Sequence, residues 1–418
     1  MAFQKGIQKI YASLCLIVPL FIWPKGGNSD HFYLPKLVLT ALFCCVLLVF
    51  LIRHRHEVKK FKVIDNVTLT SLIFLLLLSI SLFYAVDLRE SLLGRVNRYE
   101  GYLTIVLYLF LFWGSRFIQD DRWMLRMLVV GIVLQAIYGI AQSNGFDPII
   151  RDDVRLGWQS AFGTLGNPNF FGSFMVMALP LSLWFLFKQQ LLVGAAVYAL
   201  VFYALLESMT RGAWLGACVG LFVSVWVVRK SPKYLSKISL IFIISFTLLI
   251  HYNQSHHNQV VTHALSIPKE AVDVLVQAET APQAGSYRIF IWTHVLELIQ
   301  ARPLTGYGFD YLPKLFFEHY QKDMQYVMGR LMTIDKAHNE YLNIAVSAGI
   351  PSLIAYLALV FVVLKQSLSN GKSFLFAVIV AYLVQAFFNI SVVSVAFVYW
   401  ILLGRLVPYA SKSDFQTY

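Results

Sequence analysis

The stretch DKAHNEYLNIAVSAGIPSLIAYLALVFVVL runs from Asp335 to Leu364 and decides how the rest of the chain is interpreted. It begins with charged and polar residues and ends as an unbroken apolar run, as expected where a water-exposed segment enters a membrane. His338 lies just before that entry. What this histidine does depends on which side of the membrane it faces and on which other side chains gather there.

The composition is that of an integral membrane protein. Of 418 residues, 58% are hydrophobic and 13% are charged, whereas a soluble domain carries about 25% charged residues. The apolar runs are about 16–24 residues long, which suits helices that cross a hydrocarbon core and not the short alternating strands of a barrel. Because each span in lipid must satisfy its own backbone hydrogen bonds, the sequence predicts an all-α membrane protein.

Two basic segments orient the predicted spans. RHRHEVKKFK (Arg53–Lys62) holds five Lys or Arg residues and RKSPKYLSK (Arg229–Lys237) holds four, so the positive-inside rule puts both in the cytoplasm. Working outward from them predicts about twelve transmembrane helices with both termini cytoplasmic. The predicted spans lie at about residues 8–24, 35–52, 66–86, 102–118, 124–142, 171–187, 191–209, 213–228, 238–252, 341–364, 374–391 and 394–409.

One outer connection is unusually long. It divides the chain into N-terminal helices (1–251), an extracytoplasmic loop domain (252–340) and C-terminal helices (341–418). A loop of roughly ninety residues is far longer than an ordinary connection and is typical of a functional segment. We expect it to form a small, largely helical domain against the outer membrane surface.

The outer loop contains two helical patterns. LPKLFFEHYQKDMQYVMGRL (312–331) is one candidate helix. SYRIFIWTHVLELIQ (286–300) is the other, and its apolar residues recur at helical spacing, at Ile289, Trp292, Leu296 and Ile299.

Charge and cysteine usage exclude several functions. The net charge of +12 follows mainly from the positive-inside bias, so we predict no nucleic-acid partner. The segment HHNQVVTH (256–263) lacks clean metal-ligand spacing, so we predict no zinc site. We also predict no disulfide framework and no metal site from the four cysteines, which all lie in apolar runs: Cys15, Cys44, Cys45 and Cys218.

Arg211 lies in ESMTRGAWLG, at the predicted outer membrane boundary, where a turn this short needs no arginine. One interpretation is an interfacial residue whose charged head reaches water. The other is a functional site, because Glu207 lies four residues earlier and could pair with Arg211 on one helix face.

Three further arginines have a plain and a functional interpretation. Arg288 begins the first outer helix and is either a solvated helix residue or a ligand of phosphate oxygens, which arginine binds in a planar, bidentate way. Arg95 and Arg98, in GRVNRYEGY, are three residues apart, so a helix would place them on one face beside Glu100. This segment is either an interfacial belt or a site for an anionic headgroup or pyrophosphate.

His338 is a candidate general base, because the pKa of histidine suits proton transfer near neutral pH, although a lone histidine is more often structural. Asn339 or Glu340 could orient it. FGTLGNPNFFGSF (162–174), which contains Asn167, predicts a tight polar turn, or a place where backbone N–H groups approach a ligand. Outward-facing arginines with a histidine at a span boundary fit one chemistry, sugar transfer from a lipid-linked pyrophosphate donor.

The sequence resembles the O-antigen ligase and polymerase family of polytopic membrane glycosyltransferases over most of its length. The resemblance is carried by TRGAWLG around Arg211, by SYRIFIWTHVLELIQARPLTGYGFD (286–310) and by AHNEYLNIAVSAGIPSLIAYL (337–357). FGTLGNPNFFGSF and NRYEGY also look like stretches of the family. Their order and topological positions make the match more specific than any one motif.

The resemblance implies a GT-C-like fold in the bacterial plasma (inner) membrane, with an active site on the extracytoplasmic face. It implies an undecaprenyl-diphosphate-linked glycan as donor and a glycan, lipid or protein hydroxyl as acceptor, with no metal or nucleotide cofactor. In this interpretation His338 activates the acceptor, and Arg211 and Arg288 bind the donor diphosphate. Further substrate-binding candidates are Arg95, Arg98, Glu100, Glu207, Asn167 and Asn339.

Several functions remain open at the level of the sequence. Members of the family join finished polysaccharide to lipid A core, polymerise repeat units or glycosylate proteins, and nothing in the motifs distinguishes these. A transporter of lipid-linked glycan would also use about twelve spans, although paired halves with broken helices are absent. A structural scaffold of an assembly complex would tolerate alanine at Arg288 and His338.

Overall fold

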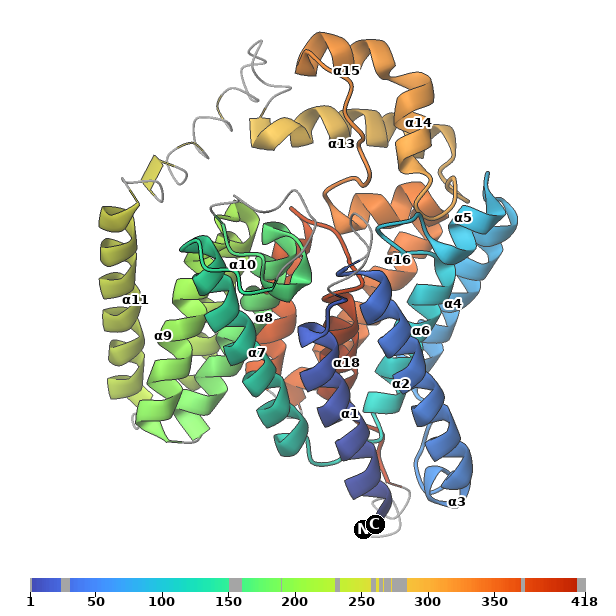
Figure 1. Ribbon diagram of the computed structural model, residues 1–418. Coiled ribbons are helices and arrows are strands. Elements are labelled where there is room, and N and C mark those ends of the chain that lie inside the picture. The colour runs from blue at the N-terminus through green and yellow to red at the C-terminus, as the bar shows by residue number, and fades with distance from the viewer. Residues whose placement is uncertain are drawn as a thin grey trace.

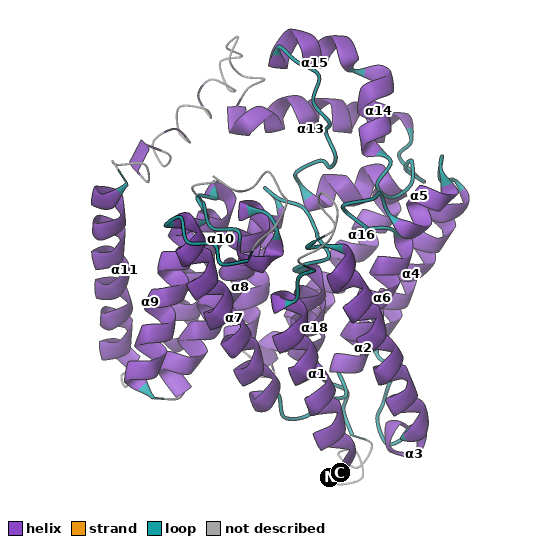
Figure 2. Cartoon of the chain, viewed as in Figure 1, coloured by secondary structure: helices purple, strands orange, loops and turns teal. Residues whose placement is uncertain are grey.

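The computed structural model describes residues 2–23, 31–149, 160–188, 190–229, 234–256, 261–262, 266, 272, 284–369 and 373–411. The described residues form helices and no strand, which confirms the all-α prediction (Figure 2). The helices are α1 (Ala2–Leu20), α2 (Leu34–Arg53), α3 (Arg55–Val58), α4 (Asn66–Phe83), α5 (Leu88–Leu93), α6 (Tyr102–Ser115), α7 (Arg122–Ser143), the 3₁₀ turn η1 (Gly163–Leu165), α8 (Pro168–Lys188), α9 (Leu191–Glu207), α10 (Arg211–Val228), α11 (Leu235–Ser255), α13 (Ala284–Ala301), α14 (Leu312–His319), α15 (Gln321–Met328), α16 (Glu340–Ser369), α17 (Ser373–Ala386) and α18 (Ala396–Leu406).

Each predicted span overlaps one helix of the structure. Seven helices in the described part are long and apolar enough to cross a membrane, namely α2, α4, α7, α8, α10, α11 and α16. Four shorter apolar helices, α6, α9, α17 and α18, have 10–17 residues. The chain is therefore a multi-pass membrane protein, while the count of twelve spans stays a prediction.

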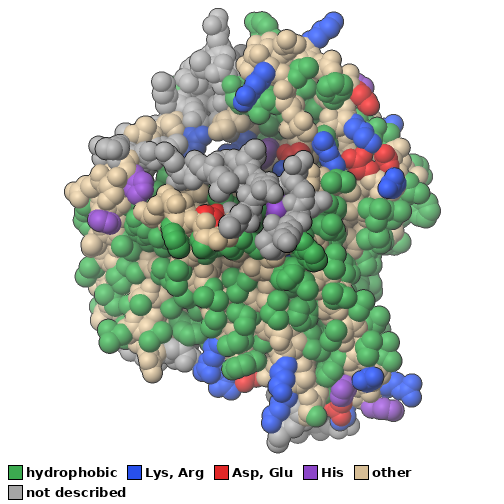
Figure 3. All heavy atoms as spheres, viewed as in Figure 1, with side chains coloured by type: hydrophobic (Ala, Val, Ile, Leu, Met, Phe, Trp, Pro, Cys, Tyr) green, Lys and Arg blue, Asp and Glu red, His purple; other side chains and the backbone are tan. Residues whose placement is uncertain are grey.

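One end of the helix bundle gathers the start of α1, the connection after α3 and the segment after α18. The amide of Lys62 donates to the carbonyl of Ala410 (3.0 Å), and the side chain of Gln4 donates to the carbonyl of Phe117 (2.9 Å). Figure 3 shows Lys and Arg side chains at this end, below a broad hydrophobic band. Helices α13, α14 and α15, which are called the outer helices below, lie at the opposite end of the bundle (Figure 1).

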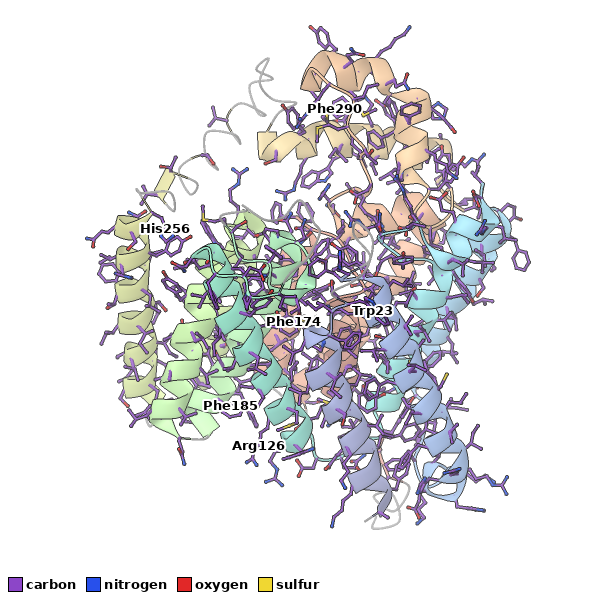
Figure 4. The ribbon with its side chains drawn as sticks, in the orientation of Figure 1. Trp23, Arg126, Phe174, Phe185, His256 and Phe290 are labelled. Atoms are coloured by element: carbon purple, nitrogen blue, oxygen red, sulfur yellow. The ribbon has the colours of Figure 1, made fainter. Side chains whose placement is uncertain are left out.

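The two ends have separate hydrophobic cores. In the bundle, 89% of the residues in the apolar stretch of α8 are buried, but only 11% of those in the apolar stretch of α11 are. Helix α8 is therefore central and α11 is peripheral. The second core joins α13, α14 and α15 to the first turns of α16. Phe174 lies in the bundle and Phe290 in the outer helices (Figure 4).

The outer helices differ from the predicted pattern in two ways. The buried stripe of α13 includes Ile291, Val295 and Leu298, and of the four predicted positions Ile299 is buried whereas Leu296 is 47% exposed, so the predicted stripe is only partly correct. Helix α13 has more apolar residues than fit on one of its faces. The packing of α13 on α16 decides which of them are buried. Residues 312–331 form two short helices, α14 and α15, rather than one.

Helix α16 is broken near its start, where it receives the segment that follows α13. Gly349 has a φ of +83°, and Pro351 follows in the next turn. Such a break leaves backbone groups without helical partners, and residues 303–308 pair with them. The amides of Tyr307, Gly308 and Ile350 donate to the carbonyls of Val346 (3.0 Å), Ser347 (2.9 Å) and Pro303 (2.7 Å).

Replacing Gly349 with alanine is expected to lower the thermal midpoint of the purified protein in detergent. A left-handed backbone costs an L-residue about 1–2 kcal/mol, and a Cβ at Gly349 would also overlap the carbonyl of Leu304. Gly329 is the matched control, because its φ is +67° with nothing within 4 Å of an added Cβ. Equal thermal midpoints for Gly349→Ala and Gly329→Ala would mean that the overlap of the added Cβ with Leu304 costs no stability, which would contradict this prediction.

Candidate active site

A cavity of about 320 Å³ lies between the bundle and the outer helices. Arg211, Arg288 and His338 all line it, so the structure brings together three residues that are far apart in the chain. The space-filling view shows a hollow beneath the outer helices with Lys or Arg side chains at its edge (Figure 3). The other described lining residues are Asn169, Met209, Thr210, Ser286, Tyr287, Ile291, Met328, Met332, Thr333 and Ile334.

Arg211 reaches the cavity because a tight turn separates α9 from α10. Met209 has a φ of +51°, and Thr210, with an extended backbone, precedes the first residue of α10. Arg211 therefore begins α10 at the end of the bundle that faces the outer helices. Its Nη1 donates to the hydroxyl of Ser266 at 2.8 Å.

Arg288 lies at the corresponding end of α13. Ser286 and Tyr287 have φ values of +60° and +66°, so regular helical backbone begins at about Arg288. Its side chain is half-buried, and its charge lowers the pKa of His338.

The backbone around His338 is held in place by the residues on either side of it. The indole N–H of Trp292 donates to the carbonyl of Ala337 (3.0 Å), and the side chain of Asn339 accepts from the amide of Leu342 (3.1 Å). Such a cap contributes about 0.5–2 kcal/mol to a helix. Lys336 is buried and forms an ion pair with Asp310. Of the residues from Lys336 to Asn339, His338 is the one that lines the cavity.

Residues at the N-terminal ends of four helices line this one cavity. Asn169 lies in the first turn of α8, Arg211 begins α10, Arg288 lies near the start of α13, and His338 precedes α16 by two residues. Helix N-termini carry partial positive charge and unpaired N–H groups, so they favour anions. The two arginines add full positive charge, and the cavity is suited to an anionic ligand.

Strained backbone concentrates at this site. Among the described residues, seven that are not glycine have positive φ, and four of them line the cavity: Met209, Ser286, Tyr287 and His338. The other three are Asn97 and Tyr99, which lie on either side of Arg98, and Asp310, which pairs with Lys336. Such conformations cost about 1–3 kcal/mol each and persist where the surrounding structure enforces them, which is typical of functional sites.

The electrostatics of the cavity favour the neutral form of His338. Burial lowers the pKa of His338, the charge of Asp335 opposes this, and the charges of Arg288 and Arg98 add to it. A neutral imidazole can accept a proton, whereas an imidazolium cannot. The arrangement fits a base beside an anion-binding surface.

The segment that holds Arg95 and Arg98 is a turn, not the helix that would have put the two side chains on one face. Arg98 pairs with Asp335, and its Nε donates to Oδ2 of that carboxylate at 2.6 Å. The backbone amide of Arg95 donates to Asp310 at 3.0 Å. Neither arginine is among the described residues that line the cavity.

Glu100 lies in a second, smaller cavity of about 50 Å³ deeper in the protein, together with Lys336 and Glu340. Tyr108 donates to Glu100 at 2.5 Å. Burial raises the pKa of Glu100, and the charge of Lys336 opposes this. Tyr382 donates to Glu340 at 3.0 Å, so Glu340 faces the bundle and Asn339 caps α16, and neither contacts His338 through its side chain.

Glu207 and Arg211 do not share a helix face. Glu207 ends α9 and Arg211 begins α10, because the turn at residues 208–210 separates them. The ionic partner of Glu207 is His256, at 3.9 Å. His257 and His263, the other histidines of that segment, lie outside the described residues.

Asn167 caps the start of α8, since its side chain accepts from the amide of Asn169 at 2.8 Å. Asn169, and not the predicted Asn167, is the asparagine that lines the cavity. Asp335 is the other omission. It lies three residues before His338, but nothing in the sequence alone shows that the chain turns back there.

Residues 195–357 match a family model described as O-antigen ligase. The matched segment runs from α9 into α16 and contains Arg211, Arg288 and His338. Arg95, Arg98, Glu100 and Asn167 lie outside it. No curated protein matches the chain.

Proposed function

We propose that the chain, whose residues 195–357 match the O-antigen ligase family model, transfers a glycan from an undecaprenyl-diphosphate carrier to a hydroxyl acceptor. The acceptor would lie on the extracytoplasmic side of the bacterial plasma membrane. The cavity supports this side, because it lies at the end of the bundle opposite the basic segment Arg53–Lys62, which the positive-inside rule puts in the cytoplasm.

The observation that carries the proposal is the convergence of two arginines, four helix N-termini and one histidine on one cavity. A diphosphate is a compact anion with oxygens that arginine binds in pairs. Ile291, Met328 and Met332 supply apolar surface beside the charged groups, which suits a donor that joins a lipid to a diphosphate. A transporter needs a path through the bundle, whereas this cavity lies between the bundle and the outer helices, so the arrangement favours a transferase.

In the proposed reaction, an acceptor hydroxyl attacks the anomeric carbon of the donor sugar. The new bond joins the acceptor oxygen to that carbon, and the bond from the carbon to the phosphate oxygen breaks. His338 takes the hydroxyl proton, and undecaprenyl diphosphate leaves with the bonding electrons. Arg211 and Arg288 stabilise the charge that develops on the leaving diphosphate.

The direct test is made in the host. The gene is deleted and complemented with wild type or His338→Ala, and surface and carrier-linked glycans are separated on a gel. Loss of surface glycan with long chains on the carrier, restored by wild type alone, is the expected result for a ligase. Single repeat units on the carrier would instead indicate a polymerase, and full rescue by His338→Ala would contradict the assigned base.

The pH dependence of transfer follows from the surroundings of His338. Burial lowers the pKa of this imidazole, and Arg288 and Arg98 add to the effect. Since the base must be neutral to act, kcat/KM should fall on the acid side, with a midpoint below the ordinary histidine value of about 6.5. The profile is measured with purified protein and carrier-linked glycan from the deletion strain. A midpoint above that value would contradict the electrostatics described here.

A further inference from the structure

The carboxylate of Asp335 lies between two basic side chains and faces each with a different oxygen. Its Oδ1 lies 3.9 Å from Nε2 of His338, which is an ionic distance. Its Oδ2 accepts from Nε of Arg98 at 2.6 Å and is also paired with Nη2. The two contacts fix the orientation of the carboxylate with respect to the imidazole.

The guanidinium of Arg98 contacts two aromatic rings and a backbone carbonyl in addition to Asp335. Its guanidinium carbon lies 5.7 Å from the ring centre of Tyr33 and 5.8 Å from that of Phe170. Its Nη1 donates to the carbonyl of Asn97 at 3.1 Å, within the turn whose residues Asn97 and Tyr99 have positive φ. Because this guanidinium is occupied by Asp335 and by two rings, it fits a fixed support for Asp335 better than a diphosphate ligand.

The charges around His338 create a need for such a carboxylate. Arg211 of α10 and Arg288 of α13 line the same cavity, and Arg98 and Lys336 lie behind it. Lys336 is paired with Asp310. When His338 takes a proton it becomes one more cation in a partly buried, cationic site, which is unfavourable unless an anion lies close.

We propose that Asp335 orients His338 and supplies the counter-charge to the imidazolium that forms during transfer, and that Arg98 is a positioning residue that acts through Asp335. The proposal rests on the proposed function. Because Nε2 is the ring nitrogen that lies near Asp335 (3.9 Å), the proposal places the imidazole proton on Nε2 and leaves Nδ1 to accept the proton of the acceptor hydroxyl. A carboxylate has the same two effects on a catalytic histidine in hydrolytic triads.

The first test reads the protonation of His338 without any glycan. Diethyl pyrocarbonate modifies neutral imidazole, so the rate of modification of His338, followed by mass spectrometry over a pH series, gives the midpoint of its titration in the full chain. In Asp335→Asn the midpoint should move to lower pH, because the anion that favours the imidazolium is gone. Asp323→Asn is the matched control, since Asp323 lies beside another histidine, His294 (3.5 Å), on the outer helices.

The second test is kinetic and uses carrier-linked glycan from the deletion strain. Asp335→Asn should lower kcat by about tenfold or more, with little change in the KM for the donor, because part of the contribution of the base is lost. Asp335→Glu should restore part of the rate. Arg98→Ala should also lower kcat, although it removes a cation and so should not move the His338 midpoint to lower pH. A fall in rate without that shift is the signature of a positioning role.

The outcomes separate this proposal from the proposed function. An unchanged His338 midpoint in Asp335→Asn would overturn the pairing, even if wild type transfers glycan and His338→Ala does not. Unchanged transfer by Arg98→Ala would overturn its positioning role. If the midpoint moves as expected but His338→Ala transfers glycan like wild type, the assignment of His338 as the base fails, and the catalytic part of this inference fails with it. If wild type itself transfers no glycan, the proposed function fails, although the pairing of Asp335 with His338 stands.

Discussion

Replacing His338 with alanine is expected to reduce glycan transfer by about 10²–10⁴-fold while donor binding stays unchanged. General-base catalysis contributes about this much, and the proposed diphosphate ligands are the arginines and not the histidine. Transfer and donor binding are both measured with purified protein and carrier-linked glycan from the deletion strain. His319→Ala is the matched control, since His319 is exposed on α14 and does not line the cavity.

Two results would contradict this assignment. If His338→Ala binds the donor much more weakly than wild type, His338 is a donor ligand and the base lies elsewhere. If it transfers glycan at the wild-type rate, the positive φ of His338 (+48°) and the ties of its neighbours serve the structure alone.

Replacing Arg211 or Arg288 with alanine is expected to lower transfer by about 10²–10³-fold each, as for the loss of one charge-stabilising donor. Both variants should also bind the donor more weakly, because the diphosphate carries its charge before the reaction as well as after it. Arg288→Lys should recover only part of the loss, since an ammonium group lacks the planar pair of donors that suits phosphate oxygens.

Arg302 provides the control for the arginine variants. It is exposed at the end of the outer helix that carries Arg288, and its guanidinium carbon lies 4.7 Å from the ring centre of Tyr307, away from the cavity. Arg302→Ala should transfer at close to the wild-type rate. A loss as large as that of Arg288→Ala would mean that the general charge of the outer helices matters and not a specific ligand.

Much of the fold follows from local sequence. Apolar length predicts where helices occur, because a helix in lipid must satisfy its own backbone groups over the full width of the hydrocarbon core. The exposed position of Leu296 shows what local pattern misses. In α13 several apolar faces compete, and the partner helix α16, distant in sequence, decides which one is buried.

The site could be predicted in part for a similar reason. Arg211 and His338 stand out because each places a charged or polar side chain at an expected membrane boundary, and Arg288 stands out because it begins a predicted helix of the outer loop. Asn169 and Asp335 do not, because their importance comes from backbone turns. The positive φ at Met209, which directs the start of α10, belongs to a residue type that favours no such conformation, so no sequence rule signals it.

Backbone hydrogen bonds between residues 303–308 and the broken start of α16 join α13 and α16 into one packed unit. Arg288 and His338 both belong to this unit, whereas Arg211 belongs to the bundle through the packing of α10 on α8 and α17. The spacing between the two arginines is thus set by how α16 packs on the bundle, where it contacts α4 and α17. A diphosphate held by both arginines would therefore join the outer helices to the bundle at a second place, in addition to the packing of α16 on α4.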